Sequence, residues 1–162
     1  MSLPTQQLMH ELFDYHDGDL YWKVKSSTKV SIGDKAGSVT AKGYRQISIK
    51  GWLYLAHRLI YLMHHGDLPW CIDHIDGNPS NNRIENLRAA TLTENMANRP
   101  INSNNTSGFK NVYKSKNGKK WIVVLKLKDK QKYFGTYDDI ELASLVATEA
   151  RAKYHKEFAR DE

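Results

Sequence analysis

The spacing of apolar positions changes several times in the first half of the chain, and each change marks an expected element. Residues 5–16 carry apolar side chains at helical spacing and predict a short amphipathic helix that ends near Asp17–Gly18. Four strands are expected next, at residues 20–24, 35–39, 44–49 and 52–55. The Lys50–Gly51 pair predicts the turn before the last of them. Residues 56–63 return to helical spacing, and Gly66 is expected to stop that helix.

The middle of the chain predicts two short strands followed by a helix. Residues 72–75 and 87–90 read as strands joined by a polar loop. Thr91 and Glu94 have the spacing of a capping box, in which the first residue caps a helix and the carboxylate three positions later binds back to it. Asn95 should then lie in the opening turns of that helix.

A polar segment separates this region from a second group of elements. Residues 99–108 are rich in turn formers and almost free of apolar side chains, which predicts a linker. Three strands are expected after it, at residues 109–115, 119–128 and 131–137, with turns at Asn117–Gly118 and Asp129–Lys130. A final helix over residues 139–158 presents Ala143, Ala147, Ala150, Tyr154 and Phe158 along one stripe.

Charge and cysteine content narrow the class of protein. Lys and Arg outnumber Asp and Glu by 24 to 18, which gives a net charge of +6 and suits a polyanionic partner. Nine lysines and one acidic residue lie between residues 109 and 132, so the excess is concentrated there. Cys71 is the only cysteine, which excludes an intramolecular disulfide and a thiol-only zinc site. Neither a secretory signal nor an apolar run of membrane-spanning length is evident, so we expect a cytoplasmic protein without a membrane partner.

One short stretch collects groups suited to phosphodiester chemistry. Asp73 and His74 are adjacent, and Asn86 and Asn95 follow closely. Carboxylate and amide oxygens suit a hard divalent cation, and a histidine with an ordinary pKa of about 6.5 can accept a proton at neutral pH. The strand–strand–helix order should bring Asn95 alongside Asp73 and His74. We therefore expect a one-metal nuclease site.

The residues of this stretch resemble the HNH nuclease family, as found in phage and intron-encoded homing endonucleases. The resemblance is carried by the ordered segments Asp73–Asn78, Asn82–Arg83, Asn86–Arg88 and Asn95. The upstream segment Ala56–Tyr61 is similar to the one that precedes the motif in that family. The similarity covers roughly residues 15–98.

The HNH resemblance implies a fold and a role for each residue. The fold is a ββα-metal (His-Me finger) core, in which His74 activates a water while Asp73 and Asn95 bind one Mg²⁺, Mn²⁺ or other divalent ion. Asn86 would brace the loop between the two strands. The products would carry a 5′-phosphate and a 3′-hydroxyl. Arg83 and Arg88 are solvated, ion-paired or in contact with phosphate.

The remaining histidines and the loop after Asp76 admit other roles. His57 is either a packed helix histidine or an accessory catalytic residue. A zinc site could in principle use four side chains of suitable type: His64, His65, Cys71 and His74. Their spacing matches no established zinc pattern, and the paired cysteines of zinc-bound HNH relatives are absent. A calcium loop starting at Asp76 fails, because Leu87 occupies the twelfth position where a glutamate is needed.

The C-terminal block, from about residue 108 to residue 158, resembles an AP2-type DNA-binding domain. The matching segments are Val112–Lys114, Gly118–Trp121, Tyr133–Tyr137 and the alanine-rich helix. Alternation places Ile122, Val124, Lys126 and Lys128 on one face of the middle strand. We expect that face to meet double-stranded DNA through Tyr113, Lys116, Lys126, Lys128, Gln131 and Tyr133. Lysines where arginines usually read bases indicate modest sequence discrimination.

Together these features predict an α+β protein of two modules. Residues 1–98 form the HNH nuclease domain with a β-rich N-terminal extension, residues 99–108 the linker, and residues 109–162 an AP2-like module of three antiparallel strands and one helix. The expected activity is that of a phage homing or nicking endonuclease in a bacterial host cell, as a monomer or weak homodimer. The alternatives are a non-catalytic DNA-binding protein that keeps the HNH scaffold, and a nuclease for RNA or branched DNA.

Overall fold

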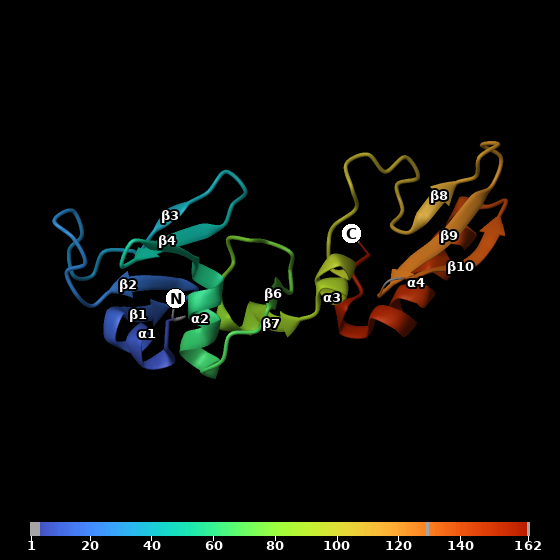
Figure 1. Cartoon of the computed structure of the whole chain (residues 1–162). Helices are drawn as coiled ribbons and strands as arrows, with labels where there is room; N and C mark the ends of the chain where they lie inside the picture. The colour runs from blue at the N-terminus through green and yellow to red at the C-terminus, as the bar shows by residue number, and fades with distance from the viewer. Residues whose placement is uncertain (1–3, 129, 162) are drawn as a thin grey trace. The chain divides into compact units, whose positions relative to one another are not determined.

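The computed structural model describes residues 4–128 and 130–161, and the chain divides between Ala90 and Thr91 into two compact units (Figure 1). The predicted α+β character is confirmed, because both units combine small antiparallel sheets with helices. No helix among the described residues is both long and apolar enough to span a membrane.

The first unit begins with a helix and a tight hairpin. Helix α1 spans Gln6–Leu12, and strands β1 (Phe13–His16) and β2 (Asp19–Trp22) pair antiparallel directly after it. The prediction of one helix over residues 5–16 was therefore wrong for residues 13–16. Asp17 and Gly18 have φ of 47° and 89°, the left-handed pair of a two-residue hairpin turn. This turn and the pairing of the flanking strands outweigh the helical spacing of the apolar residues.

A three-stranded antiparallel sheet follows, in the order β3-β4-β5. Its strands are β3 (Ser38–Val39), β4 (Arg45–Ile49) and β5 (Trp52–Leu55). Lys50 and Gly51 form the predicted turn, with φ of 50° and 83°. The strand expected at residues 35–39 is shorter than predicted, because Lys35 makes only an isolated bridge to Tyr21.

Helix α2 and a second hairpin complete the first unit. Helix α2 spans Ala56–His65 and ends at Gly66, whose φ of 77° gives the predicted left-handed stop. Strands β6 (Cys71–His74) and β7 (Leu87–Ala90) pair antiparallel, and the 3₁₀ helix η1 (Ile84–Asn86) lies between them in sequence.

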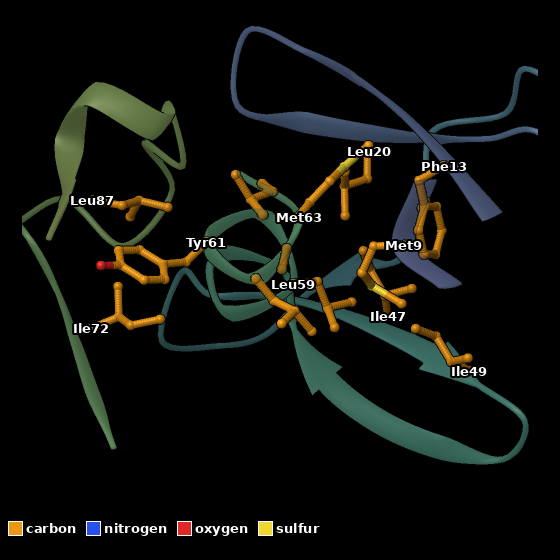
Figure 2. Packing of buried hydrophobic residues seen from close by; sticks show 14 of the residues in the cluster. Met9, Phe13, Leu20, Ile47, Ile49, Leu59, Tyr61, Met63, Ile72 and Leu87 are labelled. Carbon is orange, nitrogen blue, oxygen red and sulfur yellow. The ribbon is translucent and has the colours of Figure 1, made fainter. Parts of the chain in front are cut away.

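The core of the first unit gathers around α2. Figure 2 shows Met9, Phe13, Leu20, Ile47 and Leu59 packed together, on elements from α1 to α2. In the same view the Tyr61 side chain points from α2 toward Ile72 of β6 and Leu87 of β7. Burial of large apolar side chains stabilises by about 1.5–3 kcal/mol each, so this contact attaches the β6–β7 hairpin to the rest of the unit.

The second unit is a three-stranded sheet packed against one long helix. Its elements are α3 (Leu92–Ala97), β8 (Val112–Lys114), β9 (Trp121–Leu127), β10 (Lys130–Tyr137), α4 (Ile140–His155) and the 3₁₀ helix η2 (Lys156–Phe158). The sheet order is β10-β9-β8, all antiparallel. Val123 and Leu125 are buried against the alanine stripe of α4, as the sequence predicted. The turn predicted at Asp129–Lys130 includes residue 129, which lies outside the described residues.

Helix α3 belongs to the second unit, whereas the sequence placed the boundary in the linker at residues 99–108. Lys110 explains the difference, since its Nζ donates to the carbonyl oxygen of Ala97 at 2.7 Å and to that of Arg160 at 2.9 Å. The first bond holds the end of α3, and the second holds the C-terminal segment. The predicted division into functional domains is a separate matter and stays a prediction.

Candidate functional site

The β6–β7 hairpin positions the adjacent residues Asp73 and His74. They are the last two residues of β6, where Asp73 pairs with Arg88 and His74 with Leu87. Both side chains are buried. Successive residues of a strand point to opposite faces, so the carboxylate and the imidazole emerge on the two sides of the hairpin.

His74 lies among polar and aromatic side chains from three other parts of the first unit. Its Nε2 is 3.0 Å from Oδ1 of Asn82, which comes from the loop after β6. Its ring meets that of His57 edge to face, with centroids 4.9 Å apart. Tyr44, just before β4, has its ring centroid 6.1 Å from that of His74 and 5.8 Å from that of His57. The imidazole is therefore held on several sides by the unit that carries it.

The His57 side chain is neutral at physiological pH. Burial of its ring, together with the neighbouring His74 and Arg58, lowers its pKa from the ordinary value of 6.5 to about 3. A neutral imidazole packed on His74 restrains its ring without adding a charge. The geometry therefore matches the packed-histidine reading of His57, and an accessory catalytic role stays a prediction.

Asp73 and Arg88 form a partly buried ion pair. The Arg88 Nε donates to Oδ2 of Asp73 at 3.0 Å, and Nη2 is 2.9 Å from the same oxygen. Arg88 is therefore ion-paired, which is one of the states expected for it. Arg83 is different: its guanidinium is exposed, 3.8 Å from the exposed carboxylate of Asp17. Phosphate contacts by either arginine stay predictions.

Asn86 ties together the loop that connects β6 to β7. Its Oδ1 accepts from the Asp76 N–H at 3.1 Å, and its Nδ2 donates to Oδ1 of Asp76 at 3.0 Å and to the carbonyl of Asn81 at 2.8 Å. Burial tends to raise the pKa of Asp76, but hydrogen bonds from Asn78, Asn81 and Asn86 outweigh it and hold the pKa below its usual value. This is the geometry of the loop brace expected for Asn86.

Asn95 lies on α3 in the second unit and directly follows Glu94, the second residue of the capping box. Thr91 Oγ1 accepts from the Glu94 N–H at 3.2 Å, and Glu94 Oε2 accepts from the Thr91 N–H at 2.7 Å, which confirms the predicted helix start. The expected approach of Asn95 to Asp73 joins the two units, so it stays a prediction.

The predicted metal ligands, Asp73 and Asn95, offer a carboxylate oxygen and an amide oxygen. Within residues 4–128 and 130–161, no three His, Cys, Asp or Glu side chains gather into a metal-binding cluster. Mg²⁺ is commonly held by one or two protein carboxylates or amides together with water and substrate phosphate. The buried Asp73 carboxylate, oriented by Arg88, fits that requirement.

On the side away from α4, the sheet of the second unit presents two tyrosines together with Lys126 and Gln131. Cross-strand pairing puts Tyr113 opposite Ile122, Tyr133 opposite Val124 and Gln131 opposite Lys126. Partners in such pairs point to the same side, and this side is opposite to buried Val123 and Leu125. We call these positions the outer face: Tyr113, Ile122, Val124, Lys126, Gln131, Tyr133 and Thr136. Lys116 lies in the turn between β8 and β9, and Lys128 follows β9.

The contacts of Asn82 and Tyr44 with His74 were not predicted from the sequence, although Asn82 lies in a segment that resembles the HNH family. Asn82 reads as a turn former, and its contact with His74 depends on the course of the loop between them. Tyr44 reads as the start of a strand, and it reaches the site only because β4 lies beside α2 in the first unit. Both contacts are tertiary, which explains why no spacing rule identified them.

Comparisons with known proteins found one family model and one phage relative. A model of the HNH endonuclease family matches residues 54–97, which include Asp73, His74, Asn86 and Asn95. Protein 3.8 of Escherichia phage T7 is 35% identical over 106 residues, which cover 64% of this chain and 87% of that protein. The chain belongs to the family of phage T7 Protein 3.8. No solved structure matches the chain.

Membership of the Protein 3.8 family fits the predicted phage origin. The HNH resemblance inferred from the sequence is confirmed for residues 54–97. That range holds His57 and the whole β6–β7 hairpin. The AP2-like resemblance of the second unit stays a prediction.

Proposed function

We propose that this protein is a metal-dependent endonuclease that hydrolyses phosphodiester bonds in double-stranded DNA. The observation that carries the proposal is the match of residues 54–97 to the HNH endonuclease model, because that range includes the consecutive residues Asp73 and His74 at the end of β6. The phage relative supports action inside a bacterial host cell. The homing role remains part of the proposal.

The chemistry assigns one task to each residue. His74 accepts a proton from water, and the resulting hydroxide attacks the phosphorus while the bond to the 3′ oxygen breaks and that oxygen takes up a proton from solvent water. This leaves a 5′-phosphate and a 3′-hydroxyl. A Mg²⁺ ion held by Asp73 and Asn95 would offset the charge on the phosphate and on the leaving oxygen. Arg88 keeps the Asp73 carboxylate in a fixed orientation, and Asn86 braces the loop.

The outer face of the second unit is the proposed DNA-binding surface. Tyr113 and Tyr133 are 52% and 61% exposed there, although large aromatic side chains are usually buried. Lys126 and Gln131 lie beside each other across β9 and β10. Lysines supply salt-dependent affinity for phosphates, and the polar tips of Gln and Tyr can contact base edges. These positions support the proposal that the sheet binds DNA as an AP2-type domain does.

One active site per chain cuts one strand in each binding event, so a nick is the expected product of a monomer. The test is incubation of supercoiled plasmid with the wild type and with His74→Ala, in Mg²⁺ and in EDTA, with nicked and linear products resolved on a gel. His10→Ala is the matched control, because His10 is exposed on α1.

Nicking that needs Mg²⁺, is lost in His74→Ala and persists in His10→Ala would support the proposal. Linear product formed in a single step would indicate a dimer. Cleavage that survives EDTA or the His74 substitution would contradict the proposal. Salt-sensitive DNA binding without cleavage, on plasmid and on phage genomic DNA, would favour the non-catalytic alternative.

A further inference from the structure

Two buried polar side chains meet at Asn82 and His74, which are only 3% and 6% exposed. Oδ1 of Asn82 lies 3.0 Å from Nε2 of His74. Buried polar atoms are almost always hydrogen-bonded, and an amide oxygen is purely an acceptor. Nε2 must then carry the hydrogen. A neutral imidazole has a single N–H, so Nδ1 is the nitrogen with the lone pair.

The N-terminal hairpin fixes the chain next to Asn82. A Cβ on Gly18, in the β1–β2 turn, would lie 2.7 Å from the Arg83 nitrogen and 2.9 Å from the Asn82 carbonyl carbon, so the two backbones touch. The Tyr15 hydroxyl, from β1, accepts a 2.9 Å hydrogen bond from the Ile84 N–H. The hairpin thus holds both ends of the short segment that begins at Asn82.

The other side of Asn82 is held from within its own loop. The preceding carbonyl, that of Asn81, accepts from Nδ2 of Asn86 at 2.8 Å. Asn82 therefore has little freedom to follow a rotating imidazole, and its amide acts as a fixed reference for the ring of His74.

We propose that Asn82 is a positioning residue that selects the Nε2–H tautomer of His74 and fixes the orientation of its ring. Nδ1 is then the atom that accepts the proton from water. The catalytic role of Asn82 rests on the proposed function. The tautomer of His74 is a property of the protein alone and does not depend on it. The β1–β2 hairpin, outside the HNH match at residues 54–97, contributes to the site through this residue.

The tautomer can be measured without any cleavage assay. In protein with ¹⁵N-labelled histidine, at alkaline pH and in EDTA, two-bond ¹H–¹⁵N correlations distinguish Nε2–H from Nδ1–H rings, and the spectrum of His74→Gln identifies the His74 signals. The wild type should show the Nε2–H form. Asn82→Asp keeps an acceptor and should keep that form, whereas Asn82→Leu should give a mixture of tautomers.

Cleavage kinetics provide the second readout. A general base contributes about 10²–10⁴-fold, so loss of its orientation in Asn82→Leu should lower kcat by roughly 10- to 100-fold with little change in KM. Asn82→Asp should restore most of kcat, which a general packing defect would not allow. An Nδ1–H tautomer in the wild type, or an Asn82→Leu protein with unchanged tautomer and kcat, would overturn the proposal.

The experiments distinguish failure of the proposed nuclease function from failure of the positioning role of Asn82. A wild type that never cleaves DNA would overturn the proposed function and the catalytic role of Asn82 with it, whatever the tautomer. Cleavage with the wrong tautomer would leave the nuclease standing and reject only the positioning role.

Discussion

The guanidinium of Arg88 and the carboxylate of Asp73 face each other across β6 and β7, with side chains only 16% and 5% exposed. Removal of one partner from a buried ion pair leaves the other charge uncompensated, which typically costs about 3–5 kcal/mol. Arg88→Ala should therefore lower the free energy of unfolding by about that amount, measured by urea denaturation.

Arg83→Ala is the control for Arg88→Ala. Its partner Asp17 is 3.8 Å away and both side chains are largely exposed, so this change should cost less than about 1 kcal/mol. Asp73→Asn combined with Arg88→Ala should recover part of the loss. Equal effects of the two single arginine substitutions would contradict the importance of the buried pair.

Metal binding should stabilise the protein through Asp73. A ligand at ten times its dissociation constant adds about 1.4 kcal/mol to the stability of the state that binds it. Mg²⁺ should therefore raise the Tm of the wild type, and the increment should vanish in Asp73→Asn. Asp67→Asn, an exposed change in the same unit, should keep the increment. An equal increment in all three proteins would remove Asp73 from the metal site.

His57 should make the stability of the first unit fall in acid. Its folded pKa is about 3, against 6.5 for an ordinary histidine. Between these values the unfolded chain binds a proton that the folded chain does not, so stability rises with pH and is complete above about pH 6.5. At pH 5 the loss should be about 2 kcal/mol relative to pH 8.

The measurement compares unfolding free energies from pH 5 to pH 8 for the wild type and His57→Leu. The variant is less stable overall if the packing is disturbed, but its dependence on pH should be weaker by about 2 kcal/mol over this range. His10→Leu, a change at an exposed position, should leave the dependence unaltered. The same slope in all three proteins would refute the depressed pKa.

Gly18 should tolerate no side chain, because its φ is +89° and a Cβ would collide with the backbone of Asn82 and Arg83. Gly51 offers a matched control, since its φ is +83° and nothing lies within 4 Å of its Cβ position. Both substitutions by Ala carry the left-handed penalty of about 1–2 kcal/mol. Only Gly18→Ala should cost clearly more and also slow DNA nicking. Equal unfolding free energies for the two variants would contradict the close packing.

The elements with strong local signals were predicted correctly from the sequence. The Thr91–Glu94 capping box, the stop of α2 at Gly66 and the Lys50–Gly51 turn each depend on a few neighbouring residues, and all three are present. The stretch from Phe13 to His16 was assigned to a helix because its apolar spacing fits either structure. Pairing with strand β2 makes this stretch extended, and the local spacing of apolar residues does not reveal such a pairing.

The candidate site also combines residues that the sequence identifies with contacts that only the tertiary structure shows. Asp73 and His74 are adjacent in sequence, and Asn86 braces its own loop, so a motif can identify all of them. The contacts that Asn82 and Tyr44 make with His74 depend on how a loop and a strand fold back onto the hairpin. No rule based on sequence spacing predicts how this loop and this strand fold back, so only the structure reveals the two contacts.

Lys126 tests whether the outer face of the second unit binds DNA. A lysine that neutralises one phosphate releases counterions. Its removal therefore makes the negative slope of log K against log salt concentration less steep by about 0.9. Lys126→Ala should show this change and weaker binding of duplex DNA, measured by fluorescence anisotropy at several salt concentrations. Lys153→Ala is the matched control, because Lys153 is exposed on α4, which covers the other side of the sheet. Equal losses for the two variants would mean that net charge, and not the outer face, governs DNA binding.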